Sequence, residues 1–518
     1  MAQSVGERAP GLALRTTRGR VVLIAAVSAS AMASLDATVV NVALPHLGRE
    51  FHADVSSLQW VLTGYLLALS SLILLGGALG DRFGRRRIFV IGTVWFAVAS
   101  LLCAASQNIG TLVAARVAEG VGGALLTPGS LAILQASFRE SDSAAAVGAW
   151  SGLGGIAGAI GPFVGGGLVD GPGWRWAFLI NVPVAAVAIV CAMSSVPETR
   201  DMRWSGHLDV RGAAIAVAAL APLTWALTEA GSQGWSSAAV VVPGVAGVVA
   251  AALFVRHLRR VHNPLVPPAL FRDRAFTVVN LATVQLYGAI GVAFFLVAYE
   301  LQVGSGWTAL RAGIAMLPAT VLMLILSARS GALAQRIGPR IQLSLGPPLA
   351  GAGLILLARI GTHPSWLTDV LPGAFVFGIG LVVFVAPLTA TVMAAADADH
   401  VSVASGVNNA IARTASLAAL AVIPVVSGLA RATGAAQVTH SYRVAMVIAG
   451  VLAALAGVTG FVGLRSSVRG IRGARRLYCA VDGPPIQADP ARCPVRARPE
   501  FFQPPEPPVS GTRNSSSG

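Results

Sequence analysis

The sequence predicts an all-α protein that crosses a membrane many times. Three observations indicate this: of 518 residues only 11% are charged, 55% are hydrophobic, and the mean hydropathy is +0.72. A soluble domain of ordinary composition has about 25% charged residues, and single soluble cores stop growing at about 250–300 residues. So little charge over such a length means that most residues face lipid or other apolar helices.

Apolar segments of about 20 residues, the length that a spanning helix needs, recur along the whole chain. We predict about 14 spanning helices by this criterion. They lie near residues 21–45, 57–80, 88–106, 110–137, 144–169, 176–196, 209–229, 237–256, 276–301, 309–333, 341–360, 370–395, 404–428 and 443–465. The first segment follows basic residues, as a signal peptide does, but it is longer than the roughly 7–15 apolar residues of such a peptide. We therefore interpret it as the first membrane helix.

The distribution of arginines predicts the orientation. With the N-terminus inside, the inner connections carry most of them, including Arg82, Arg85, Arg86 and Arg87 in a single loop. The outer connections carry only Arg49, Arg175, Arg359, Arg431 and Arg443. Since cytoplasmic loops are enriched in basic residues, we expect a multi-pass protein of the cell membrane with both termini cytoplasmic. Because these arginines flank apolar segments, the net charge of +15 does not indicate nucleic-acid binding.

The sequence does not support a function other than transport. Cys103, Cys191, Cys479 and Cys493 lack the spacing of metal ligands. No His-x-x-x-His pair and no phosphate-binding loop in a strand–helix setting is present. We therefore predict neither a metal nor a cofactor, and a membrane enzyme or receptor without transport is the less favoured alternative.

The chain contains an internal repeat. GALGDRFGRR at 77–86 recurs as GALAQRIGPR at 331–340, with six of ten positions identical. Related halves are typical of transporters that rock two bundles about a central site. We predict a cytoplasmic N-terminal tail at 1–20, a six-helix bundle at 21–196, two inserted helices with a linker at 197–274, a second six-helix bundle at 275–465, and a cytoplasmic tail at 466–518. The last segment is rich in Pro, Arg and Ser, which predicts disorder.

The loop GALGDRFGRRRIF, Gly77–Phe89, is the most specific motif. A glycine allows a tight turn between two helices, and an acid beside several arginines can form ion pairs that latch two bundles together. The predicted cytoplasmic gate comprises Gly77, Asp81, Arg82, Gly84, Arg85 and Arg86. The alternative is that the arginines only set the orientation. In the second copy Gln335 replaces the acid, so a charged latch would be one-sided.

Five segments together resemble the major facilitator superfamily. GALGDRFGRRR resembles its signature loop between helices 2 and 3, LVAARVAEGVGGA (112–124) its fourth-helix motif, and GLGGIAGAIGPFVGG (152–166) its fifth-helix antiporter motif. LDATVVNVALP (35–45) and WRWAFLINVP (174–183) resemble motifs of the 14-helix drug:proton antiporter branch. The resemblance spans about residues 20–465. It implies the major facilitator fold, two six-helix bundles plus two inserted helices, in a monomer that exports small amphipathic molecules in exchange for protons.

Asp36 is a single acid in the first apolar segment. A charge at the centre of a membrane helix costs about 2.5–3.5 kcal/mol on insertion scales, so such acids are functional hypotheses by default. Burial disfavours the charged form of a carboxyl group. A buried acid can therefore bind and release a proton as its surroundings alternate between dry and wet. The alternative is a structural acid that bonds to a neighbouring helix, through Thr38 or Asn41.

Arg116 is the second charge predicted inside an apolar helix. It must face the bundle interior or a cavity, and a fixed positive charge favours ionisation of a nearby carboxyl group in one conformation and not in another. Glu119 lies one turn away, at i+3, and could pair with it. The family more often has Gln there. Two possibilities stay open: that Glu119 titrates, or that it simply neutralises Arg116.

The fifth helix carries small residues at three- or four-residue spacing, which lets another backbone approach closely. They are Gly154, Gly158, Gly161 and Gly165, with Pro162 bending the helix. The resemblance implies a hinge or seal, and static close packing is the alternative. Further polar residues could line the cavity: Asn41, Glu300, Asn408, Asn409 and Arg413. Two alternatives stay open for the substrate: many different drugs, or one metabolite made by the same cell.

Overall fold

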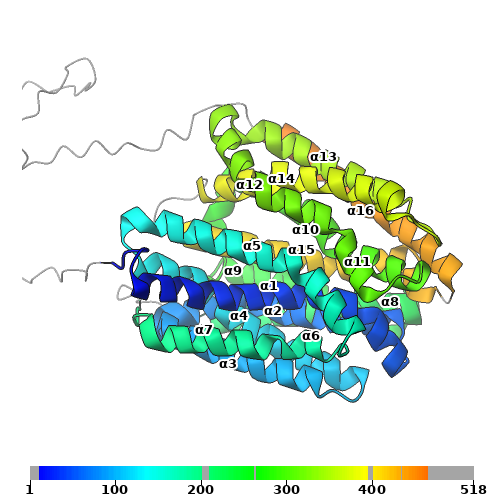
Figure 1. Ribbon diagram of the computed structural model, residues 1–518, viewed down its shortest axis with the longest axis horizontal. Coiled ribbons are helices and arrows are strands. Elements are labelled where there is room, and N and C mark those ends of the chain that lie inside the picture. Colours follow the sequence, from blue (N-terminus) through cyan, green and yellow to red (C-terminus); the bar gives the residue numbers. More distant parts are fainter. Residues whose placement is uncertain (1–10, 201–208, 262–263, 395–400, 433, 465–518) are drawn as a thin grey trace, which may run out of the picture. The chain divides into compact units, whose positions relative to one another are not determined.

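The structure is a computed structural model that describes residues 11–200, 209–261, 264–394, 401–432 and 434–464 (Figure 1). Across this part of the chain the fold is helical, and the only β pairing is an isolated bridge between Leu12 and Phe138. Thirteen helices among the described residues are long and apolar enough to span a membrane. The all-α membrane class is confirmed, and the number fourteen is not. The predicted tail at 466–518 lies outside the described residues.

The N-terminal half is built from seven helical segments that follow the predicted spans closely. They are α1 (Thr17–Phe51), α2 (Val55–Phe83), α3 (Arg85–Ala104), α4 (Ile109–Ser137), α5 (Glu140–Asp170), α6 (Trp176–Leu179) and α7 (Asn181–Ser195). Side-chain oxygens of Thr16, Asp54 and Asn108 accept hydrogen bonds from the first turns of α1, α2 and α4, which satisfies N–H groups that a helix start leaves free. α1 packs against α5 and α7, and α4 packs against α2 and α3.

The C-terminal half repeats this organisation. It comprises α10 (Arg274–Tyr299), a π-helical turn η2 (Glu300–Gly304), α11 (Ala309–Ala315), α12 (Leu317–Ile337), α13 (Pro339–Leu357), a π-helical turn η3 (Trp366–Val370), α14 (Leu371–Ala394), α15 (Val401–Val426), η4 (Leu429–Arg431) and α16 (Ala435–Gly463). α10 packs against α15 and α16, and α13 packs against α14 and α16. The short 3-10 turn η1 (Pro268–Arg272) precedes α10.

The internal repeat is visible in the backbone. Gly84 separates α2 from α3 with φ +114°, and Gly338 separates α12 from α13 with φ +82°. Both are conformations that residues with a Cβ adopt rarely. A side chain at position 84 would also approach the Glu198 carboxylate to 2.5 Å. The two copies of the motif therefore make equivalent helix–helix junctions.

Two of the predicted single helices are broken, and a proline accounts for each break. The span expected at 309–333 is divided at Met316 into α11 and α12, and Pro318 stands at the start of α12. The span expected at 176–196 is divided at Ile180, and Pro183 offers no N–H to the carbonyl of Leu179. Proline lacks the donor that would continue the helix and its ring collides with the preceding turn.

The pair that was predicted to be inserted corresponds to α8 (Val210–Gln233) and α9 (Ala238–Leu258). α8 packs against α9, α2 and α15. Near its end, the carboxylate of Glu229 accepts hydrogen bonds from Ser56 (3.2 Å) and Trp60 (3.3 Å) of α2. The side chains of α9 are largely exposed; for example, Val242 is 65% accessible. Such an apolar surface suits a helix that faces lipid.

Candidate functional site

Three charged side chains meet in the interior of the N-terminal half. Nη1 of Arg116 in α4 lies 2.6 Å from Oδ2 of Asp36 in α1 and 2.6 Å from Oε2 of Glu119, one turn further along α4. Each residue is at most 1% exposed. We call Asp36, Arg116 and Glu119 the Asp36 cluster. The structure therefore brings together all three residues that were predicted to couple protons.

Neutral groups from two more helices complete the contacts of the carboxylates. Asn181 of α7 donates from Nδ2 to Oδ1 of Asp36 (3.4 Å) and to Oγ of Ser100 (3.1 Å). Ser100 of α3 in turn donates to Oε1 of Glu119, and the Cys103 thiol lies 3.5 Å from the other oxygen. The two acids are thus joined by a chain of hydrogen bonds as well as by the arginine.

The guanidinium of Arg116 is held by the backbone and by aromatic rings. Its Nε donates to the carbonyl of Val61 in α2 (3.1 Å). Its Cζ lies 4.4 Å from the ring centre of Tyr65 and 5.8 Å from that of Phe178, an arrangement that favours a cation. Its Nη2 is buried and has no hydrogen-bond partner among the described residues. Arg116 is therefore fixed in place, with the two N–H groups of Nη2 unpaired among the described residues.

The charges of the Asp36 cluster do not balance. Two ionised carboxylates and one guanidinium would leave one net negative charge in a site with no exposed surface. Burying an uncompensated charge is expensive, and groups in that position gain a proton instead. Two acids that share a site also disfavour each other's ionisation. The cluster thus holds two acidic side chains for one basic side chain.

The structural alternative for Asp36 predicted hydrogen bonds through Thr38 or Asn41, but both of these side chains bond elsewhere. The Thr38 hydroxyl donates to the carbonyls of Ser34 and Leu35, and Asn41 donates to that of Ala37, all within α1. Asn41 instead lines a small cavity with residues of both halves, including Pro162 and Phe294.

Sequence reasoning missed the neutral members of the site. Asn181 lies inside the segment WRWAFLINVP. The resemblance of this segment to a family motif predicted no role for Asn181. Ser100, Cys103 and Tyr65 gave no signal, because neutral polar and aromatic residues are common in membrane helices. Only the packing of α2 and α3 against α4, and of α7 against α1 and α3, gives these side chains their role.

The predicted gate residues lie at the junction of α2 and α3. Arg85 pairs with Asp81 at 2.8 Å, one turn apart, and the guanidinium of Arg86 donates to the carbonyl of Val196 (3.2 Å). Arg82 is exposed and stacks near Phe83, and Gly77 packs beside Pro128. Across the described residues, no hydrogen bond or ion pair joins this loop to the C-terminal half. A latch between the halves stays a prediction.

The glycine face of α5 permits close packing against α1. A Cβ at Gly165 would lie 2.9 Å from Cα of Val39, one at Gly161 would lie 3.0 Å from Cβ of Thr38, and one at Gly158 would lie 3.6 Å from Cβ of Ser34. Gly154 also lies in α5, in a part of the helix whose side-chain packing is outside the described structure. Pro162 lies within the helix. This geometry fits both a hinge and static packing.

The polar residues predicted for the C-terminal half lie on two elements, α15 and η2. Asn408 of α15 donates to Asn280 and Thr283 of α10, each at 2.9 Å. Asn409 and Arg413 of the same helix are half-buried. Glu300 is fully buried in the π-helical turn, where Thr439 donates to it at 2.6 Å. Their lining of a transport cavity stays a prediction.

The two halves are joined at the end of the bundle where α5 ends. Asp170 accepts hydrogen bonds from the backbone N–H groups of Ala309 (3.1 Å) and Leu310 (2.8 Å) at the start of α11. Gln302 donates to the carbonyl of Val42 at 3.0 Å. We call these contacts the Asp170 seam. These contacts hold the two halves together at this end.

Spanning helices arranged as two repeated halves, with a charged cluster buried in one of them, define a membrane transporter and not an enzyme. The chain belongs to the Major Facilitator Superfamily, whose family model matches residues 26–421. The resemblance noted in the sequence is thereby confirmed.

Relatives of the chain include drug and antibiotic resistance proteins. The chain is 33% identical to the methylenomycin A resistance protein of Bacillus subtilis, over 79% of this chain and 88% of that protein. It is 33% identical to the puromycin resistance protein pur8 of Streptomyces alboniger, over 82% and 88%. It is 34% identical to the tetracenomycin C resistance and export protein of Streptomyces glaucescens, over 72% and 70%.

Solved structures share the fold. A peptide transporter POT in complex with sulfate superposes with a TM-score of 0.64 at 14% identity, over 88% of this chain and 96% of that chain. At this identity the likeness concerns the fold alone.

Proposed function

We propose that the protein is a proton-driven antiporter that exports small amphipathic molecules, such as antibiotics, across the cell membrane. The observation that carries this is the unbalanced charge of the buried Asp36 cluster. A site that is neutral only with one proton can exchange that proton for substrate when it opens to alternate sides. A proton that enters with the membrane potential contributes about 2.3 kcal/mol per 100 mV.

The cycle follows from the predicted orientation, with both termini cytoplasmic and one chain as the transport unit. The Asp170 seam then lies on the outer side and closes it. In this state the substrate would enter from the cytoplasm. A proton arriving from outside would neutralise the Asp36 cluster after the seam has opened.

Transport into inverted membrane vesicles tests the proposal. Puromycin, tetracenomycin C and methylenomycin A, compounds in the names of the relatives, serve as probes. We expect that an acid vesicle interior drives accumulation of at least one probe and that a protonophore abolishes it. Accumulation of the probes that does not depend on the pH gradient would contradict proton coupling.

A dedicated exporter of one endogenous compound is the second candidate. It is favoured by the relative from Streptomyces glaucescens whose name refers to both resistance and export of a single antibiotic. Mutual competition among unrelated probes in the same vesicles would support the multidrug function, whereas accumulation of one probe without competition would support the dedicated one.

Replacing Glu119 by glutamine distinguishes a shared proton from a static ion pair. Without this carboxylate, Asp36 and Arg116 form a neutral pair that has no charge deficit for a proton to fill. We expect gradient-driven accumulation to fall to the level of protein-free vesicles, while downhill movement of the probe persists. Gradient-driven accumulation equal to wild type would show that Glu119 only neutralises Arg116.

Replacing Asp170 by alanine is expected to open the Asp170 seam more often. The change removes two charge-assisted hydrogen bonds, and bonds to charged groups contribute about 1.5–3 kcal/mol each. We therefore expect about a tenfold or greater rise in the labelling rate of a cysteine placed at Met316, using an impermeant thiol reagent from outside. Asp369→Ala is the control, because Asp369 bonds Ser365 within the same half. An equal rate in both variants would contradict the role of the seam.

A further inference from the structure

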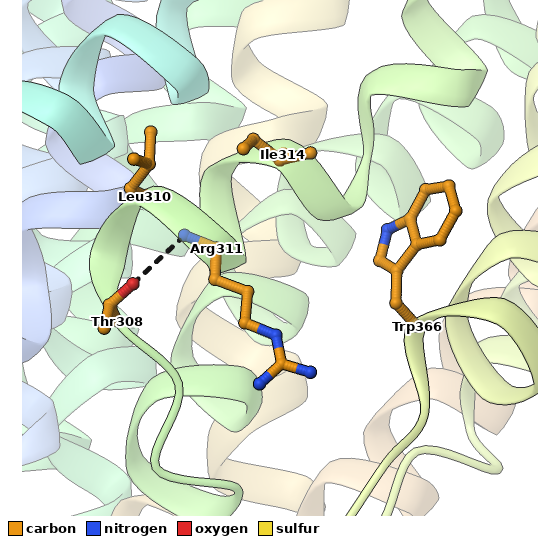
Figure 2. A pocket seen from close by; sticks show the side chains of 5 residues that line it. All are labelled: Thr308, Leu310, Arg311, Ile314 and Trp366. Carbon is orange, nitrogen blue, oxygen red and sulfur yellow. Dashed lines mark hydrogen bonds between the residues drawn. The ribbon is translucent and has the colours of Figure 1, made fainter.

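A second site lies at the seam end of the C-terminal half, far along the chain from the Asp36 cluster. An open pocket of about 360 Å³ is lined by Thr308, Leu310, Arg311, Ile314 and Trp366 (Figure 2). Its two walls are α11 and η3, and each of them begins a candidate membrane span. The pocket is therefore at the level where spanning helices enter the membrane.

The pocket carries a cation that forms no ion pair among the described residues. Arg311 is exposed, and its Cζ lies 3.9 Å from the ring centre of Trp307. Within the described parts of the chain it has no carboxylate partner. Its backbone N–H is already used by the Thr308 hydroxyl at 3.3 Å, which fixes the start of α11 (Figure 2). The guanidinium is thus positioned by its stacking and is free to bind an anionic group.

The opposite wall carries a donor without an acceptor. Nε1 of Trp366 is buried and has no hydrogen-bond partner among the described residues. Figure 2 shows this indole nitrogen and the Arg311 guanidinium on opposite sides of the pocket. A buried N–H left unpaired is unfavourable, and such groups are rare in folded proteins. Acceptor oxygens on a bound ligand would satisfy these two groups.

The remaining lining is apolar. Leu310, Ile314 and the ring of Trp366 offer surface for hydrocarbon, and tryptophan is enriched at the membrane–water interface. Arginine binds phosphate through several N–H groups at once. A ligand that fits must therefore combine a phosphate with an apolar chain. A free phosphate ion would leave the apolar walls uncovered.

We propose that this pocket binds the headgroup phosphate of an anionic glycerophospholipid from the adjoining leaflet. A net negative headgroup suits the pocket better than a zwitterionic one, because the ammonium of the latter would repel Arg311. The acyl chains would lie along Leu310 and Ile314. This site is separate from the Asp36 cluster, so the proposal does not depend on the proposed antiport.

Native mass spectrometry of the full chain in detergent tests the proposal, with phosphatidylglycerol and phosphatidylcholine as probes at equal concentration. We expect one phosphatidylglycerol to be retained in preference to phosphatidylcholine. Arg311→Gln removes a charge-assisted contact, and we expect it to weaken this binding about tenfold or more. Trp366→Phe keeps an aromatic side chain but removes the N–H together with the pyrrole part of the indole, and we expect a weakening of about threefold to tenfold.

The control is Arg49→Gln, which makes the same charge change at an exposed residue at the end of α1. We expect it to bind phosphatidylglycerol like wild type. Equal binding by wild type, Arg311→Gln and Trp366→Phe would overturn the proposal. Displacement of the lipid by inorganic phosphate at similar concentration would overturn the proposal that the ligand is a lipid, since the apolar walls would then contribute nothing to binding.

Discussion

Replacing Asp36 by asparagine is expected to abolish gradient-driven export. Asparagine has nearly the same shape and can still accept a hydrogen bond from Asn181, but it cannot take up a proton. The remaining pair, Arg116 and Glu119, is neutral without one. The measurement is accumulation of the exported probe in inverted vesicles with an acid interior, where we expect the level of protein-free vesicles.

Asp54→Asn is the matched control for this variant. Asp54 is an exposed residue that caps the start of α2 by accepting from Ser57 at 2.9 Å, and asparagine caps a helix equally well. We expect it to export like wild type. Both variants should insert in equal amounts, because the substitution at Asp36 removes a buried charge. Full gradient-driven export by Asp36→Asn would remove this residue from the mechanism.

Replacing Arg116 by methionine is expected to be the most destabilising single change. It leaves two carboxylates buried without a cation, and breaking a buried ion pair from one side costs about 3–5 kcal/mol. The cation–π contact with Tyr65 is lost as well. We expect a large fall in the midpoint of thermal unfolding of the purified protein in detergent, together with low yield.

The double variant Arg116→Met with Glu119→Gln keeps this prediction testable if the single variant does not fold. It removes one of the two stranded carboxylates, so we expect a higher unfolding midpoint than for Arg116→Met alone. Glu119→Gln in the wild-type background should change the midpoint little, because Asp36 still pairs with Arg116. A double variant no more stable than Arg116→Met would contradict the charge argument.

The spanning helices were predictable because their signal is local. A run of about 20 apolar residues is sufficient to cross a bilayer, and α2, α4 and α8 begin within two residues of the expected positions. The breaks inside the predicted spans at Met316 and Ile180 were not anticipated, although Pro318 and Pro183 are visible in the sequence. A proline does not break every helix, since Pro128 and Pro162 lie inside unbroken ones.

The charged residues of the Asp36 cluster were predictable one at a time. A charge inside an apolar segment is conspicuous because it is costly there, and this marked Asp36 and Arg116. The pair Arg116–Glu119 followed from helical spacing. The contact between Asp36 and Arg116, 80 positions apart, follows from no local rule. Neither do the hydrogen bonds of Ser100 and Asn181, which depend on how α3 and α7 pack.

The sequence by itself determined that this chain is a helical membrane protein with two related halves and ionisable groups within its spans. Apolar run length, repeated segments and misplaced charges all act over short distances along the chain. Only the tertiary structure decided that two acids share one arginine, that Asp170 joins the halves through α11, and that Arg311 and Trp366 line one pocket. These pairings depend on which helices become neighbours, and packing over the whole molecule selects those.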